Sequence, residues 1–343
     1  MQKALRIKLL MAGILMLSFG YGYYTTLARI VGGNAEATSK VALAELASSA
    51  PALLWGTLAD RYGAKRVAIA GLLASILAIT GLKPINVFLT LSFFYAPFLI
   101  SLLQASIYGS EVVGEAVAVL SLGWGLGIIA LELYKESYML LSISFTLGTL
   151  FVILGSTELR SEFKPWEVIL KLKPLVLPLS LFIGAEYLAY ALTALRFYEV
   201  SPDTFVLSYA IFPSITSFVC GYCAGKAVSI YGAGRVLLIS MSLYPFIVLL
   251  ALVAPPPWCL ISWSIPVYPF YETSLITLVT SVAKVSEGSA LGFTYALMAL
   301  SSLAVYPLTS LNSFETLAIV IVAMMTLSVI ILKESIKKLN LPS

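Results

Sequence analysis

Long apolar runs recur along this chain, and each is long enough to cross a lipid bilayer. The first run, from Leu9 to Ala28, contains no charged residue. A helix needs about 20 predominantly apolar residues to span the hydrocarbon core of a membrane. Of the 343 residues, 60% are hydrophobic and 11% are charged, whereas about 25% of the residues in an average soluble domain are charged. The sequence therefore predicts an integral, multi-pass membrane protein.

Charges, glycines and prolines divide the chain into twelve predicted transmembrane helices. These helices cover residues 7–29, 38–58, 67–82, 86–108, 115–131, 137–155, 174–197, 204–225, 236–253, 258–283, 288–310 and 314–332. The only long polar stretch follows the sixth of them. We expect an all-α membrane protein with one six-helix bundle in residues 1–157, a central cytoplasmic loop in residues 158–173, and a second six-helix bundle in residues 174–343.

The distribution of Lys and Arg predicts how the chain is oriented. Short cytoplasmic loops of membrane proteins carry an excess of these residues. If the N-terminus is cytoplasmic, the predicted inner segments hold 16 of the 21 cations. A miscounted helix would scramble this asymmetry. We therefore expect twelve crossings of the cell membrane, with both termini in the cytoplasm.

A short sequence pattern occurs twice, at equivalent places in the two halves. Tyr-Gly-Ala-x-Arg-Val begins at Tyr62 and again at Tyr231, 169 residues later, and Gly56 corresponds to Gly225 at the same offset. Because this offset is close to half of the chain length, the second predicted helix corresponds to the eighth. Parallel repeats of this kind are a known transporter architecture.

The segment after the second predicted helix resembles the signature loop of the major facilitator superfamily. The resemblance is carried by Gly56, Leu58, Ala59, Asp60, Arg61, Gly63, Lys65 and Arg66. It implies the fold of that superfamily, with twelve helices in two six-helix bundles and both termini in the cytoplasm. Two features typical of its drug/proton antiporters, an arginine within the fourth helix and a Gly-Pro-rich fifth helix, are missing from this sequence.

In that superfamily the signature loop is thought to latch the second helix against the eleventh in one of two access states. The resemblance implies this conformational role for Gly56, Asp60, Arg61, Gly63 and Arg66. In the second copy, Ser229 and Ile230 replace the Asp-Arg pair, so no latch is expected there. The alternative is that these charges only fix the topology.

Ionisable residues within membrane spans are costly, so they are the first candidates for binding. Glu186 and Glu272 lie near the middle of the seventh and tenth predicted helices. Tyr190 follows Glu186 by four residues and Tyr268 precedes Glu272 by four, so each pair shares a helix face. The full set of residues predicted to bind substrate or protons is Glu186, Glu272, Tyr190, Tyr268, Tyr21, Tyr24, Gln104, Glu45 and Arg29.

Two functions are open for the midplane glutamates. A carboxyl group removed from water tends to become neutral, and it releases its proton when it is wetted again. This chemistry suits a proton-coupled carrier. Either glutamate is equally able to serve as the counter-charge for a cationic substrate.

These observations predict a secondary active transporter that moves a small organic solute by alternating access, coupled to protons. The alternative is a non-transporting membrane receptor or lipid-handling protein on the same fold. An enzyme is not expected, and neither a cofactor nor a metal, because histidine is absent and no catalytic or ligand pattern is present. The expected partners are the solute, protons and membrane lipid, with no nucleic acid, and the protein is expected to be a monomer.

Overall fold

The first half of the chain forms eight helices. The structure, a computed structural model, describes residues 2–32, 35–158, 163–283, 286–308 and 314–339, in which it contains no strand. The helices of this half are α1 (Gln2–Gly32), α2 (Ala35–Ala47), α3 (Ala52–Tyr62), α4 (Ala64–Ala68), α5 (Gly71–Leu77), α6 (Pro84–Ile107), α7 (Ser110–Tyr134) and α8 (Tyr138–Gly155). The second and third predicted spans are thus each divided into two helices.

The second half of the chain begins with the longest helix, α9. Its helices are α9 (Pro165–Val200), the 3-10 turn η1 (Pro202–Thr204), the π-helix η2 (Leu207–Ile211), α10 (Phe212–Tyr231), α11 (Ala233–Val253), α12 (Trp258–Trp263), α13 (Tyr268–Val282), α14 (Glu287–Leu308) and α15 (Phe314–Lys338). Residues 165–173 were expected to belong to a loop, but they are the start of α9. Pro165 occupies the first turn of this helix, where the missing N–H costs nothing.

Eight helices in the described part of the chain are long and apolar enough to cross a membrane. They are α1, α6, α7, α8, α9, η2 together with α10, α11 and α15. Three of the other predicted spans are interrupted, at the α2–α3, α4–α5 and α12–α13 junctions. The eleventh, 288–310, extends beyond the described residues. A multi-pass membrane protein is therefore confirmed, while twelve crossings and the orientation of the termini stay predictions.

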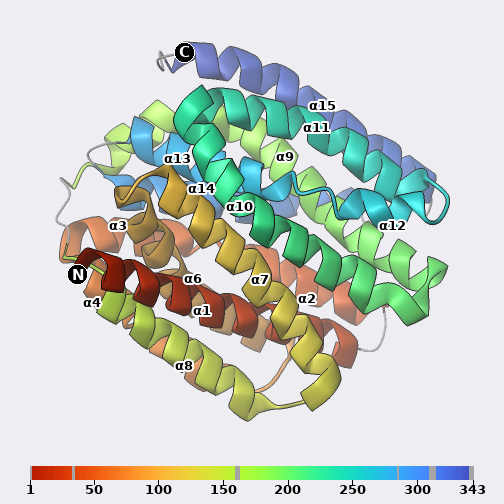
Figure 1. The fold of residues 1–343 in the computed structure, drawn as a ribbon, viewed down its shortest axis with the longest axis horizontal. Helices are drawn as coiled ribbons and strands as arrows, with labels where there is room; N and C mark the ends of the chain where they lie inside the picture. Colours follow the sequence, from red (N-terminus) through yellow and green to blue (C-terminus); the bar gives the residue numbers. More distant parts are fainter. Residues whose placement is uncertain (1, 33–34, 159–162, 284–285, 309–313, 340–343) are drawn as a thin grey trace.

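The helices of each half pack mainly against one another. In the first half, α1 packs on α7 and α8, and α5 packs on α6 and α8. In the second half, α15 packs on α9 and α11, and α13 packs on α10 and α11. Figure 1 shows the first half below and the second half above, with α7 and α10 side by side where the halves meet. The other extensive contact between the halves joins α3 to α14.

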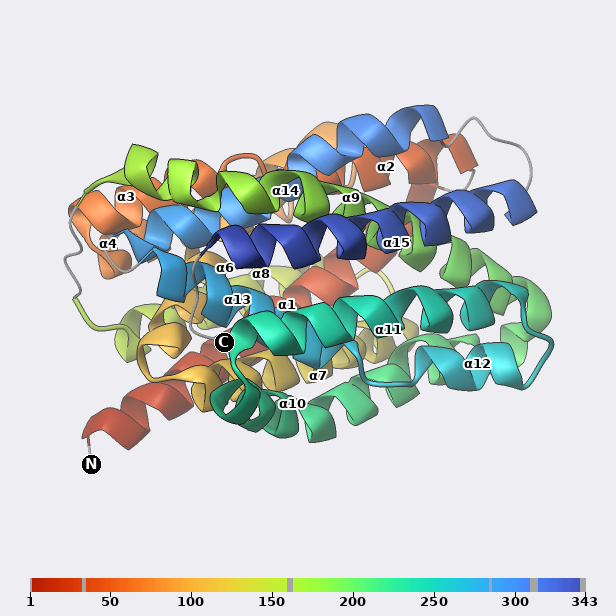
Figure 2. The same ribbon diagram turned by 90° about the horizontal axis from the view of Figure 1, so that it is seen from above.

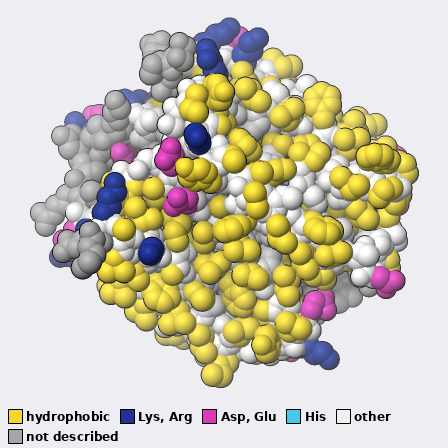
Figure 3. Space-filling model, viewed as in Figure 1, with side chains coloured by type: hydrophobic (Ala, Val, Ile, Leu, Met, Phe, Trp, Pro, Cys, Tyr) yellow, Lys and Arg dark blue, Asp and Glu magenta, His cyan; other side chains and the backbone are white. Residues whose placement is uncertain are grey.

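The outer surface of the helices is largely apolar. Exposed side chains include Ile76, Leu154, Phe246, Ile319 and Ile330. Figure 3 shows hydrophobic side chains over most of one face, with charged side chains mainly on its left and upper left part and at its lower right edge. Such an exposed apolar surface is suited to contact with membrane lipid.

Both extensive contacts between the halves, α7–α10 and α3–α14, have glycines where the backbones approach most closely. A Cβ atom on Gly56 of α3 would lie 2.0 Å from the Gly288 carbonyl oxygen of α14. A Cβ atom on Gly225 of α10, at the repeat-related position, would lie 2.6 Å from the Ser110 carbonyl oxygen of α7. Small residues let helix backbones approach this closely. The sequence repeat is therefore also a repeat of packing. Figure 2 shows the same helices from above.

We predict that Gly114→Val will destabilise the protein by separating α7 from α10. A Cβ atom at Gly114 would lie 2.4 Å from the Gly221 carbonyl oxygen and 2.7 Å from the Gly225 amide nitrogen, and backbone atoms cannot move aside as a flexible side chain does. Overpacking of this kind costs roughly 1–3 kcal/mol. The measurement is the melting temperature of the purified protein in detergent, followed by tryptophan fluorescence.

The matched control for this substitution is Gly234→Ala in the first turn of α11. A Cβ atom there would meet only the Ile336 side chain, at an ordinary 3.4 Å. We expect its melting temperature to stay within about a degree of the native value, since open helical sites tolerate alanine well. Equal melting temperatures for both variants would contradict a tight α7–α10 contact.

Candidate functional site

A cavity of about 290 Å³ lies between the two halves of the chain. Its wall is formed by residues of α1, α2, α6 and α7 from the first half, and of α9 to α14 from the second. Seven tyrosines line it, together with Trp124 and Trp263. Ligand pockets in proteins usually measure roughly 300–1,000 Å³, so this volume suits a small solute.

Three glutamates line the cavity, and each accepts a hydrogen bond from a tyrosine of another helix. Tyr244 Oη of α11 donates to Glu186 Oε1 of α9 at 2.7 Å. The Tyr295 hydroxyl of α14 donates to the Glu272 carboxylate of α13. The Tyr21 hydroxyl of α1 donates to the Glu45 carboxylate of α2. These pairs hold carboxylates of both halves at one cavity.

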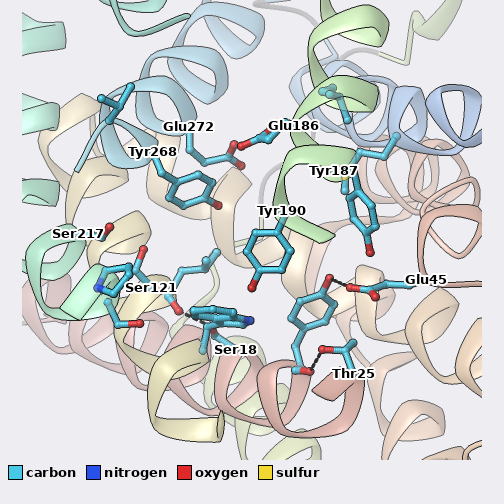
Figure 4. Close-up of a pocket in the computed structure, with 18 of the residues that line it drawn as sticks. Ser18, Thr25, Glu45, Ser121, Glu186, Tyr187, Tyr190, Ser217, Tyr268 and Glu272 are labelled. Atoms are coloured by element: carbon cyan, nitrogen blue, oxygen red, sulfur yellow. Dashed lines mark hydrogen bonds between the residues drawn. The ribbon is translucent and has the colours of Figure 1, made fainter. Parts of the chain in front are cut away.

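Glu186 and Glu272 are neighbours. Figure 4 shows their carboxylate groups pointing toward one another, with the Tyr268 ring beside them and Tyr190 below. Glu272 is buried, with 7% of its surface exposed, and Glu186 is partly buried. The sequence placed both near the middle of their helices but did not reveal that their side chains meet.

An aromatic wall forms another side of the cavity. The Trp124 and Tyr190 rings lie 5.8 Å apart, and the Tyr190 and Trp263 rings lie 5.9 Å apart, between centroids. Three helices contribute them, namely α7, α9 and α12. Aromatic rings at such distances form favourable edge-to-face or offset contacts. The wall is therefore a largely apolar surface that carries a phenol and two indole groups.

Six of the nine residues predicted for binding line this cavity, namely Tyr21, Glu45, Glu186, Tyr190, Tyr268 and Glu272. Two lie elsewhere. Tyr24 is fully buried and donates to the Gly81 carbonyl oxygen and to Thr90 Oγ1, each at 3.2 Å. Gln104 bonds to Thr157 at the end of α8, accepting from its backbone N–H at 2.9 Å. The ninth, Arg29, has a side chain outside the described part of the structure.

The face of α6 toward the cavity differs from the polar stripe that contains Gln104. Phe94, Tyr95 and Phe98 line the cavity instead. Ser101, three residues before Gln104 on the same side of the helix, donates to the Phe98 carbonyl oxygen of its own helix at 2.6 Å. Serine hydroxyls in helices often bond backward in this way, so a polar stripe alone does not mark a wet surface. In the sequence, the three aromatic residues were the pattern that could have identified the face of α6 toward the cavity.

Asp60 joins the two halves at the N-terminus of α14. Its Oδ1 accepts a hydrogen bond from the Gly288 N–H at 3.0 Å. Its Oδ2 accepts from the Ser289 N–H at 2.7 Å and from Ser289 Oγ at 2.6 Å. The first N–H groups of a helix have no partner within the helix, and the helix dipole favours an anion there. One carboxylate thus caps a helix of the other half.

The other residues of the signature loop lie around this cap. Gly63 adopts φ +94° in the one-residue turn between α3 and α4, a conformation that glycine adopts without strain. The Arg61 guanidinium lies 5.6 Å from the centre of the Phe163 ring, just before α9. Arg66 is exposed. Arg61 therefore makes a second contact between the halves.

No group of three or more His, Cys, Asp or Glu side chains in the described ranges is arranged to hold a metal ion. The cavity therefore presents carboxylates in pairs with tyrosines rather than a preformed metal centre.

No protein-family model matches the sequence, and neither does any curated protein sequence. Solved structures do resemble it. A bacterial homologue of the iron transporter ferroportin, in its outward-facing state, is 12% identical with a TM-score of 0.71, over 97% of this chain and 99% of that one. The E. coli fucose:proton symporter is 12% identical with a TM-score of 0.67, over 96% and 98%.

A third similar structure, the human organic anion transporter MFSD10, is 14% identical with a TM-score of 0.67, over 96% of this chain and 99% of that one. The structural likeness establishes the fold, but sequence identities this low leave the substrate open. The likeness spans nearly the whole length of all three chains. This membrane protein therefore has the fold of the major facilitator superfamily transporters.

Proposed function

We propose that this protein is a secondary active transporter that moves a small organic solute across the cell membrane by alternating access, coupled to protons. The observation that carries the proposal is the carboxylate-lined cavity between two repeated halves. A site at the interface of parallel repeats is what a rocking mechanism uses. The protein acts as a monomer surrounded by lipid, with both termini in the cytoplasm.

The neighbouring carboxylates support the coupling to protons. Glu186 and Glu272 point toward one another within the membrane, and two carboxylates at close range resist being charged together. A proton relieves that repulsion, and water entering the cavity favours its release. Such a pair exchanges protons with whichever side the cavity faces.

The Asp60 cap supports a latch that closes one end of the cavity. It links α3 to α14 across the boundary between the halves. The capped end also carries the α3–α4 turn and the start of α9 (Figure 1). In the proposed cycle this contact forms when the cavity faces away from that end and breaks when the halves rock the other way.

We predict that Asp60→Asn will lower transport while leaving the folded yield unchanged. Hydrogen bonds to a charged group contribute about 1.5–3 kcal/mol, so losing the charge shifts the equilibrium between the two access states by roughly tenfold or more. The measurement is the initial rate of solute uptake into proteoliposomes, with a substrate found by thermal-shift screening at pH 5.5 and pH 8.

Ser229→Ala is the matched control for this variant. Ser229 occupies the repeat-related position in α10 and is exposed. We expect its transport rate to equal that of the native protein. A native rate in Asp60→Asn would show that the charge serves topology alone.

We predict that Glu186→Gln combined with Glu272→Gln will abolish the pH dependence of transport. Glutamine keeps the shape of the side chain but cannot exchange a proton. The measurement is solute flux into proteoliposomes with and without an imposed pH gradient. The gradient should drive accumulation by the native protein but not by the double variant.

Glu334→Gln is the matched control for these two substitutions. Glu334 is exposed near the end of α15 and pairs with Lys337 at 2.8 Å, far from the cavity residues in sequence. Its flux and pH dependence should match those of the native protein. Full gradient-driven accumulation by the double variant would exclude both glutamates from coupling, and no accumulation by the native protein would favour a receptor or lipid-handling role.

A further inference from the structure

The charge of the cavity wall is one-sided. Glu186, Glu272 and Glu45 line it, while no Lys or Arg does so among the residues whose side chains are described. Glu186 and Glu272, whose carboxylates point toward one another, accept hydrogen bonds from two phenols, Tyr244 and Tyr295. Phenols share a proton with a carboxylate but do not neutralise it. The pair therefore needs a positive charge from elsewhere.

A positive charge at this pair is either a proton or a bound cation. Charged groups interact far more strongly in a membrane-embedded protein interior than in water. Two facing carboxylates in that setting are stabilised by one cation between them just as they are by one shared proton. A cationic ligand and protons would then compete for the same two side chains.

The surroundings favour an organic cation over a metal ion. Magnesium and calcium require six or more oxygen ligands, and softer metals prefer nitrogen or sulfur. The described part of the cavity offers no group of three candidate ligands. It offers aromatic rings instead, with the Tyr268 ring beside the two carboxylates (Figure 4). Aromatic faces attract ammonium groups at about 6 Å or less.

The aromatic wall fits the body of such a ligand. Trp124, Tyr190 and Trp263 form a continuous surface on the cavity. Ser214 also lines the cavity, and its buried hydroxyl makes no hydrogen bond within the described residues. It is therefore available to a polar group on the ligand. The cavity combines an anionic end, an apolar wall and the Ser214 hydroxyl.

We infer that this cavity binds a monovalent organic cation with an aromatic or bulky apolar body, its charged head between Glu186 and Glu272 and its body against Trp124, Tyr190 and Trp263. Protons compete with the cation for the two carboxylates. This substrate class rests on the proposed function for its transport, but its binding stands independently.

Five other titratable groups, all of them phenols, face the carboxylate pair. They are Tyr95 of α6, Tyr244 of α11, Tyr268 and Tyr271 of α13, and Tyr295 of α14. Phenols titrate near pH 10 in water, so none of these five groups loses its proton at pH 8 or below, and a pH dependence of binding in that range reports on the carboxylates of the cavity. Cation binding should weaken as the pH falls.

The test uses the purified full-length protein in detergent and three probes of similar size. Benzyltrimethylammonium is a permanent cation, neopentylbenzene is its neutral isostere, and phenylacetate is an anion. Trp124 and Trp263 line the cavity, so tryptophan fluorescence reports binding, with probe-loaded empty micelles subtracted. Because the cation does not titrate, any pH dependence belongs to the protein.

We expect saturable binding of the cation at pH 8, at least tenfold weaker binding at pH 5.5, and no saturable binding of the other two probes. Glu186→Gln combined with Glu272→Gln should weaken the cation at least tenfold and remove the pH dependence, and Glu334→Gln should change neither. If the double variant does not fold, each single variant replaces it. The charge preference of the native protein requires no variant at all.

The inference is overturned if the cation does not bind, if the neutral or anionic probe binds as tightly, or if the double variant binds the cation undiminished. Failure of the proposed function looks different. If a pH gradient drives the transport of a neutral solute, the proposed transport function is supported and a cation as the substrate class is refuted. If the protein binds the cation but moves no solute in proteoliposomes, the cation site is supported and the transport function is refuted.

Discussion

Within a bilayer no water is available to satisfy a polar group, and this constraint shapes the whole protein. Backbone groups of the apolar segments are paired inside helices. Hydroxyl groups such as Ser92 and Ser121 bond to carbonyl oxygens of their own helix. Carboxylates cannot do this, so each cavity glutamate is paired with a tyrosine of a neighbouring helix. The carboxylate pair and the Ser214 hydroxyl, which has no hydrogen-bond partner among the described residues, lie at the same cavity between the halves.

The repeat let the sequence predict more of the packing than hydropathy alone. Gly56 and Gly225, matched only by their offset, both lie where helices of opposite halves touch. The reason is physical, because helices whose backbones touch have no room for a side chain at the contact, so glycine occupies that position in the sequence. The resemblance of the loop implied a latch between the second and eleventh predicted helices. Asp60 contacts the start of α14, and the latch itself stays a prediction. The repeat did not predict the breaks at α2–α3, α4–α5 and α12–α13, because the residues on both sides of each break are largely apolar.

From the sequence, the charged residues of the cavity could be predicted better than its other side chains. Glu186 and Glu272 were visible because a carboxylate in an apolar run has few structural uses. Tyr24 and Gln104 share that polarity but serve internal hydrogen bonds, Tyr24 to Gly81 and Thr90 and Gln104 to Thr157. Helical periodicity chooses a face only when the outward direction of that face is known. The α6 helix has one polar face and one aromatic face, and in the structure the aromatic face lines the cavity.

A single helix carries contacts of both the cavity and the cap. Tyr295 of α14 holds Glu272, while Gly288 and Ser289 at the start of α14 bind Asp60. Tyr295 lies six positions after Ser289, about 9 Å along the helix, with one continuous hydrogen-bonded backbone between them. A helix transmits displacement along its axis because its backbone bonds resist local change. In the proposed cycle, a change of charge at Glu272 alters its hold on Tyr295, and any resulting shift of α14 reaches the Asp60 cap. The same helix would then couple the occupant of the cavity to the closure of one end.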